Sequence, residues 1–243
     1  MIKHHGRRLI NRFYRPFRLR ILGTITSVQT KEPVAALTFD DGPHPEYTPQ
    51  LLKTLDKHGA RATFFMVGEA AQRHQDLVKM VSQAGHAIGV HSWDHSSFPT
   101  ISAQERRRQL RACIRALGQY IGPYGKRLFR PPWGQQSVAS RLDALLLGYK
   151  VVTWNVVAED WLPLKPKDMA DRLMQSVKPG SIVLLHDAIY RSIFARPQYD
   201  RSAMIEALDM SLQLTDNKMR FITIPELLQH GRPALCEWFY HKS

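Results

Sequence analysis

The sequence predicts a single α/β domain built as a distorted (β/α)7 barrel. Three observations lead to this prediction. The chain has 243 residues, which fits one large domain. From Val34 onward, short apolar runs alternate with longer stretches of helical periodicity, the pattern of repeated β-α units and a parallel sheet. No linker rich in Pro, Gly and Ser interrupts the series, so a second domain is not expected.

Seven short apolar segments are expected to be the strands of this barrel, because they are rich in β-branched and aromatic residues. An earlier apolar stretch, 21–28, is interrupted by Gly23 and by three hydroxyl residues, and it is expected to be a short strand outside the series. The predicted barrel strands are 34–39, 62–67, 87–91, 128–129, 150–156, 181–185 and 220–224.

Seven helices are expected to follow these strands. Gly59, Gly85, Gly122 and Gly148 come after four of them, as is typical of helix C-terminal ends. Successive β-α units of this number are typical of a barrel like the TIM barrel, in which the active site lies at the carboxyl ends of the strands. The predicted helices are 49–57, 70–84, 103–120, 138–147, 167–177, 202–214 and 225–230.

Three regions are expected along the chain: a basic N-terminal arm with a candidate short strand (1–33), the barrel domain (34–230) and a C-terminal tail (231–243). Cys113 and Cys236 lie far apart and have no neighbours at metal-ligand spacing, so both are expected to be free thiols.

Positive charge is concentrated in the arm. The chain has 34 Lys and Arg against 21 Asp and Glu, a net charge of +13, which makes nucleic acid, anionic lipid and acidic glycan candidate partners. We interpret the arm as a peripheral contact with an anionic membrane surface, or alternatively as a solvated leader. No apolar run is long enough for a signal peptide or a membrane span, so a cytoplasmic protein is expected. Residues 1–31 of the arm include no acidic residue; their basic residues are Lys3, Arg7, Arg8, Arg12, Arg15, Arg18, Arg20 and Lys31.

Unusual polar residues follow five of the predicted strands, so they are expected to converge on one face of the barrel. Asp40 and Asp41 end the first strand before a Gly-Pro turn, which can direct both carboxylates into one pocket. Two carboxylates so close are not both ionised cheaply unless a cation lies beside them. The other polar groups are His91 to His95, Arg130, Glu159 with Asp160, and His186 with Asp187.

His91 and His95 are predicted to bind that cation together with Asp41. Two imidazoles four residues apart fall on one side of a helical turn. On its own this spacing is weak evidence, because surface or core histidines show it more often than metal ligands, but the acidic pair strengthens the metal interpretation. A set of two histidines and one carboxylate leaves coordination positions open for water and substrate.

The remaining polar residues are assigned by their positions. Asp40 is expected to be a general base for a metal-activated water, and His186 a general acid for a leaving nitrogen. Arg130, before two prolines that stiffen its loop, is expected to pair with Asp40. The alternatives are a strand-end cap for His186 with Asp187, and a surface charge beside a turn for Arg130.

Taken in order, these segments resemble the motifs of the polysaccharide deacetylase family, also called the NodB-homology family (carbohydrate esterase family 4). The resemblance extends from Val34 to about Gln229. Its five motifs are similar to Thr38-Phe39-Asp40-Asp41-Gly42, His91-Ser92-Trp93-Asp94-His95, Arg130-Pro131-Pro132-Trp133, Asp160-Trp161 and Leu184-Leu185-His186-Asp187.

The resemblance implies a distorted barrel of about seven strands and hydrolysis of an N-acetyl group on a sugar by attack of metal-activated water. It implies that Asp160 tunes His186 and that the backbone N–H of Trp133 stabilises the oxyanion. It also implies that Trp161 and Leu184 form the wall around the acetyl methyl group. One departure is Val157, where the fourth motif of the family usually begins with an aspartate.

Other functions remain open from the residues alone. A glycosidase needs two carboxylates roughly 5 to 10 Å apart, which adjacent Asp40 and Asp41 suit poorly. A non-catalytic protein that binds acidic glycan or nucleic acid is the other alternative, although no nucleic-acid motif is present and no nucleic-acid partner is expected.

Substrate and metal are only partly specified. The expected substrate is an N-acetylated glycan: a chitin oligomer, peptidoglycan, an exopolysaccharide or a lipid-linked precursor. One divalent ion is expected, with Zn²⁺ as the first choice and Co²⁺, Ni²⁺ or Fe²⁺ compatible with the ligands.

Overall fold

The computed structural model describes residues 19, 21–121, 128–190, 200–215 and 218–239. Residues 1–18 and 20 of the basic arm, and the predicted helix-ending Gly122, lie outside this described part. Within it, no helix is both long enough and apolar enough to cross a membrane.

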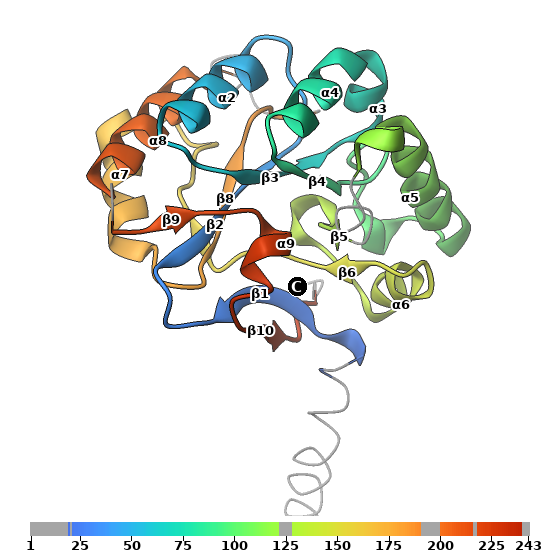
Figure 1. Ribbon diagram of the computed structural model, residues 1–243. Coiled ribbons are helices and arrows are strands. Elements are labelled where there is room, and N and C mark those ends of the chain that lie inside the picture. Colours follow the sequence, from blue (N-terminus) through green and yellow to red (C-terminus); the bar gives the residue numbers. More distant parts are fainter. Residues whose placement is uncertain (1–18, 20, 122–127, 191–199, 216–217, 240–243) are drawn as a thin grey trace, which may run out of the picture.

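A curled parallel sheet forms the centre of the molecule, with helices on its outside (Figure 1). Seven strands follow the order β6-β5-β4-β3-β2-β8-β7, and β9 pairs with the first residues of β2. The central strand β2 is buried at every position, as expected for a parallel strand covered on both faces. The strands are β2 (Val34–Asp40), β3 (Ala62–Met66), β4 (Ala87–Val90), β5 (Leu128–Phe129), β6 (Lys150–Val151), β7 (Val156–Val157), β8 (Ile182–His186) and β9 (Arg220–Phe221).

Three of the helices begin at a side-chain cap. Ser102 accepts from the backbone of Glu105 before α5, and α6 and α9 begin with capping boxes at Ser137 and Thr223. The helices are α2 (Tyr47–Lys57), α3 (Gly68–Arg73), α4 (Gln75–Gln83), α5 (Ala103–Leu117), α6 (Val138–Leu146), α7 (Pro166–Ser176), α8 (Ser202–Leu214) and α9 (Ile224–Leu227). The prediction of a one-domain (β/α)7 barrel is therefore confirmed.

Two predicted elements are each divided in the structure. The helix expected over 70–84 is α3 followed by α4, because His74 leaves the helical region with φ −130° and ψ 59°. The strand expected over 150–156 is β6 followed by β7. These two strands pair with different neighbours, β5 and β8, so the chain crosses between the two ends of the sheet within a few residues.

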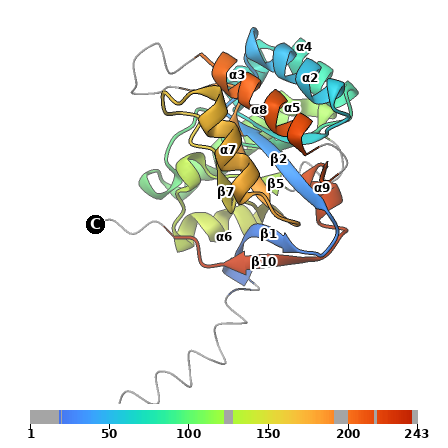
Figure 2. The ribbon, with the colours of Figure 1, turned by 90° about the vertical axis from the view of Figure 1, so that its left-hand side faces the viewer.

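An antiparallel ribbon of β1 (Thr24–Gln29) and β10 (Arg232–Cys236) lies beside the barrel (Figure 2). The predicted tail therefore includes a strand, which its short and largely exposed sequence, Arg232 to Cys236 with a proline inside it, does not indicate. β1 bridges to Val152 and Ser181, next to β6 and β8, and so spans the opening between the ends of the sheet. Gly180, with φ 82°, packs so closely on the carbonyl of Val28 that no larger residue fits.

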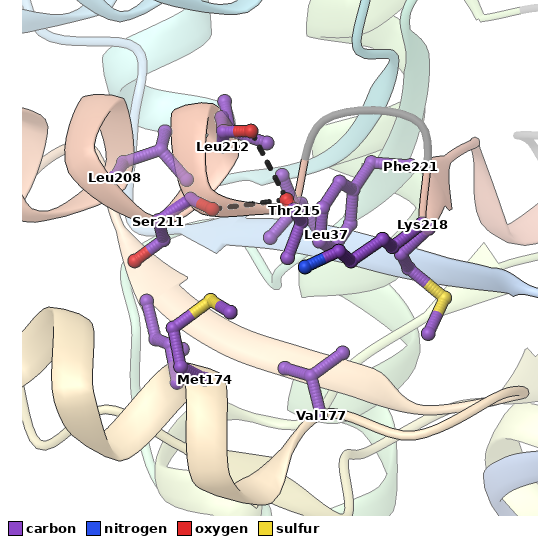
Figure 3. A pocket seen from close by; sticks show the side chains of 11 residues that line it. Leu37, Met174, Val177, Leu208, Ser211, Leu212, Thr215, Lys218 and Phe221 are labelled. Atoms are coloured by element: carbon purple, nitrogen blue, oxygen red, sulfur yellow. Dashed lines mark hydrogen bonds between the residues drawn. The ribbon is translucent and has the colours of Figure 1, made fainter.

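A mostly apolar pocket of about 140 Å³ lies between α7 and α8 (Figure 3). Met174 and Val177 face it from α7 and from the end of that helix, while Leu208 and Leu212 face it from α8. The packing of these two helices is therefore incomplete at this point.

Candidate active site

The predicted site residues lie at the carboxyl ends of neighbouring strands. β2 and β8 are adjacent and in register, so Asp40 lies directly opposite His186. His91 follows β4 and Arg130 follows β5, two adjacent strands that lie beyond β3 along the same edge. The prediction that these loops converge on one face is confirmed.

Three ligand atoms converge in the way that the sequence predicts. Asp41 Oδ1 lies 3.3 Å from His91 Nε2 and 3.1 Å from His95 Nε2, and one ligand atom from each residue lies within 4.8 Å of the others. All three residues are buried. Burial favours the neutral carboxyl, but His95 and His91 outweigh it and hold the pKa of Asp41 well below its usual range.

The segment that carries the two histidines is not the helical turn that their spacing suggests. It is a loop in which Ser92 and His95 have left-handed φ values of 68° and 62°. Ser92 Oγ accepts from the backbone of His95, and Gln109 of α5 accepts from the backbone of Trp93. The two histidine side chains do lie close together beside Asp41, as expected, but the helical turn predicted between them is wrong.

Hydrogen bonding fixes the proton on one of the two imidazoles. His91 Nδ1 lies 2.8 Å from the carbonyl oxygen of Arg130. A carbonyl can only accept, so Nδ1 carries the proton and Nε2 presents its lone pair to Asp41 and His95. This is the tautomer that a metal ligand needs.

Arg130 forms the predicted ion pair with Asp40. Its Nη1 donates to Asp40 Oδ1 at 2.7 Å and to Thr38 Oγ1 at 2.6 Å, and its Nη2 donates to the carbonyl of Thr153. The side chain is 0% exposed, and burial lowers the pKa of Arg130 while Asp40 opposes that effect. Asp40 is therefore held in one orientation, and its Oδ2 lies 3.8 Å from His91 Nε2.

His186 is paired with Asp160, the residue that the resemblance assigns to it. His186 Nδ1 lies 3.0 Å from Asp160 Oδ1, and the backbone of His186 donates to Asp160 Oδ2. Burial lowers the pKa of His186, but Asp160, Asp41 and Asp40 together raise it to about 9. Arg201 holds Asp160 from the other side, 3.5 Å from Oδ2.

A pocket of about 360 Å³ opens over these groups. The predicted contact residues Trp133, Trp161 and Leu184 line it, beside the three candidate metal ligands, Asp40 and His186. Arg130 and Asp160 do not line the pocket; they lie behind its wall, in contact with Asp40 and His186. The arrangement can bind a cation, accept a proton at one carboxylate and donate one from an imidazolium, all toward a largely apolar space.

Several residues of the site were not singled out from the sequence. Trp154, Ile189 and Tyr190 also line the pocket, and the backbone of Tyr190 donates to Asp41 Oδ2 at 3.0 Å. Nothing in the pattern around these three residues indicates a site.

Asp187 holds the turn that carries Asp41. It accepts from the backbone of Gly42 at 3.1 Å and from Thr48 Oγ1. Burial, with a contribution from Asp41, raises the pKa of Asp187 to about 7. Its position directly after His186 was the one indication in the sequence that Asp187 belongs to the site. From the sequence alone, the only role expected for it was a strand-end cap.

Sequence comparisons were made with this geometry established. The model of the polysaccharide deacetylase family matches residues 27–152, just over half of the chain. A peptidoglycan-N-acetylglucosamine deacetylase from Bacillus cereus is 34% identical over 206 residues, which are 84% of this chain and 92% of the relative. A chitooligosaccharide deacetylase from Azorhizobium caulinodans is 31% identical over 169 residues, 70% of this chain and 80% of the relative.

Solved structures give the same result. The chain is similar to a crystal structure of a peptidoglycan N-acetylglucosamine deacetylase with a TM-score of 0.75 and 28% identity, covering 86% of this chain and 94% of that one. It is also similar to a pseudoenzyme of carbohydrate esterase family 4 from Bacillus anthracis, with a TM-score of 0.74, 28% identity, and 90% and 73% of the two chains covered. On the family match and these relatives, the chain belongs to the polysaccharide deacetylase family.

Proposed function

We propose that this protein is a metal-dependent hydrolase that removes the N-acetyl group from a sugar unit of a glycan. The observation that carries the proposal is the convergence, in one pocket, of Asp41, His91 and His95 with a separate carboxylate at Asp40. A carboxylate that is not needed as a ligand can accept a proton. His186 faces the same space and can donate one.

The three proposed ligands fit a divalent cation. Asp41 Oδ1 is buried and has no hydrogen-bond partner among the described residues, although both histidine nitrogens are close. A positive ion would satisfy this oxygen and both imidazole lone pairs at once. Nitrogen and carboxylate ligands suit Zn²⁺ first, and also Co²⁺, Ni²⁺ or Fe²⁺.

A bound cation would supply Lewis-acid polarisation of a water molecule and of the amide carbonyl. The protein groups provide the proton transfers. Asp40, fixed by Arg130, accepts the proton of the attacking water. The backbone N–H of Trp133 donates to the developing oxyanion. His186, kept protonated by Asp160, donates to the amine nitrogen as the C–N bond breaks, which leaves acetate and an amino sugar.

The proposed substrate class comes from the relatives and from the pocket. The relatives are named as deacetylases of peptidoglycan N-acetylglucosamine and of chitooligosaccharides. Trp161 and Leu184 offer an apolar surface for the methyl group beside the polar groups that act on the amide. We therefore assign an N-acetylated amino sugar within a glycan as the substrate.

The test is acetate release from a panel of N-acetylated glycans by protein loaded with each candidate metal. The panel contains chitin oligomers, peptidoglycan fragments and an N-acetylated exopolysaccharide. Metal-free protein and Asp40→Asn serve as controls: metal-free protein is expected to release no acetate, and Asp40→Asn to release it at least about 10²-fold more slowly than wild type. Binding of these glycans with no acetate release from any of them, at any metal, would instead favour a non-catalytic glycan-binding protein.

A further inference from the structure

Four of the five tryptophans in the chain gather at the pocket. Trp133, Trp154 and Trp161 line it, and Trp133 remains 52% exposed. The fourth, Trp238, comes from the far end of the sequence, directly after β10. Large apolar side chains that stay partly exposed beside a pocket mark a binding surface.

Trp238 borders the pocket without lining it. Its ring packs edge-on against Trp154, with the centroids 5.5 Å apart and the planes at 68°. Gly134, which lines the pocket, lies close to both rings: a Cβ at this position would lie 2.8 Å from Trp154 and 3.4 Å from Trp238 Nε1. Because Gly134 has no side chain, both indoles can lie close to its backbone, and both are partly exposed.

The ribbon fixes the position of Trp238. Thr24 pairs with Cys236 at the end of the β1–β10 register, only two residues before Trp238 (Figure 2). β1 is anchored to the barrel by its bridges to Val152 and Ser181. Trp238 is therefore held against the site by backbone pairing.

We propose that Trp238, together with Trp154 and Trp133, forms a binding subsite for a second sugar ring next to the one that is deacetylated. This inference rests on the proposed function and names its preferred substrate: a chain of at least two sugar units. Aromatic faces contact the apolar C–H face of a pyranose ring as they contact other flat or apolar groups. Trp238 lies beyond the cavity that Trp133 and Trp154 line, and this place suits a sugar ring that lies outside the cavity.

The test compares acetate release from an N-acetylated monosaccharide, disaccharide and tetrasaccharide by the metal-loaded wild type, Trp238→Ala and Trp238→Phe. Wild type is expected to show a higher kcat/KM on the longer substrates, mainly through a lower KM. In Trp238→Ala, the ratio of kcat/KM on the tetrasaccharide to kcat/KM on the monosaccharide is expected to fall about tenfold, the effect of one lost aromatic contact. Trp238→Phe, which keeps an aromatic face, is expected to retain most of it.

Two outcomes would overturn the subsite. One is an unchanged length preference in Trp238→Ala. The other is an equal loss on all three substrates, because that would mean that Trp238 only supports the shape of the pocket.

Calorimetry separates failure of the subsite from failure of the proposed function. If wild type deacetylates none of the sugars, the proposed function fails, and the subsite is then tested by measuring the binding of the same sugars to metal-free protein. Affinity that increases with length and decreases in Trp238→Ala supports the subsite, and affinity that is independent of both refutes it.

Discussion

Asp40 and Asp41 are neighbours in sequence but have different partners in the structure. Asp41, with a left-handed φ of 77°, turns toward His91 and His95, while Asp40 remains at the end of β2 and pairs with Arg130. The difference in backbone conformation directs one carboxylate to the histidines and the other to the arginine. Adjacent identical residues can therefore take separate roles.

The base and the metal ligands can be told apart by separate substitutions. Asp40→Asn is expected to lower kcat by about 10²-fold to 10⁴-fold, the usual contribution of a general base, while metal stays bound. His95→Ala is expected to lose both metal and activity, since it removes a proposed ligand. Metal content by mass spectrometry and acetate release measure the two effects, and full activity in Asp40→Asn would refute the assigned base.

The Asp160–His186 pair predicts the alkaline side of the pH profile. His186 has a pKa of about 9, so it is protonated at neutral pH, and activity should fall as the pH rises toward that value. A bound cation adds positive charge nearby and moves this limb to lower pH. Asp160→Asn removes the carboxylate that raises the pKa, and the limb should move down by about one to three further pH units. The measurement is kcat against pH; an unmoved alkaline limb would exclude His186 as the acid.

At the scale of elements, the site loops are the least regular part of the fold. The five described non-glycine residues with left-handed φ are all in loops that follow barrel strands: Asp41, Ser92, His95, Trp133 and Glu159. Such conformations cost about 1 to 3 kcal/mol each and persist where the surroundings enforce them. The barrel strands are regular, and these five left-handed residues lie at the edge of the sheet that carries the proposed ligands.

The contrast between regular strands and irregular loops explains how much of the structure could be predicted from the sequence. The strands around Leu37, Phe64 and Val183 are buried apolar runs, and burial of such runs is a pattern that sequence reveals. The position of β10 could not be predicted, because its residues are largely exposed and its partner β1 is about 200 residues away. The loop from His91 to His95 could not be predicted either, since its shape depends on Gln109 of α5.

Packing between α7 and α8 predicts a difference between two leucines of α8. Leu208 is 1% exposed and faces the pocket between the helices, whereas Leu214, at the end of the same helix, is 56% exposed. Leu208→Ala enlarges an existing pocket and should lower the free energy of unfolding by about 2–5 kcal/mol. Leu214→Ala should lower it by about 0.5 kcal/mol or less. Urea unfolding measures both, and equal losses would contradict this packing.

At the scale of the whole molecule, charge is distributed unevenly. The net charge is +13, and the basic residues of the arm have no acidic residue among them. We propose that the arm binds anionic lipid headgroups, because each Lys or Arg near such a surface contributes about 1 kcal/mol. The contribution should decrease with salt.

Vesicle sedimentation tests this proposal. The full chain is expected to sediment with vesicles that contain phosphatidylglycerol at low salt and to remain in solution with neutral phosphatidylcholine vesicles. A variant without residues 1–18 should no longer sediment more with anionic than with neutral vesicles, while it keeps its deacetylase activity. Equal sedimentation of both proteins would show that the arm does not direct binding.

The β1–β10 ribbon has a consequence for synthesis on the ribosome. Its pairs, such as Thr24 with Cys236, join segments translated almost a full chain apart. Until β10 has left the exit tunnel, β1 has no partner along one edge, and Trp238 has not reached the pocket. The proposed metal ligands of a nascent barrel would thus be translated well before Trp238. The proposed surface for the second sugar would be the last part of the site to be completed.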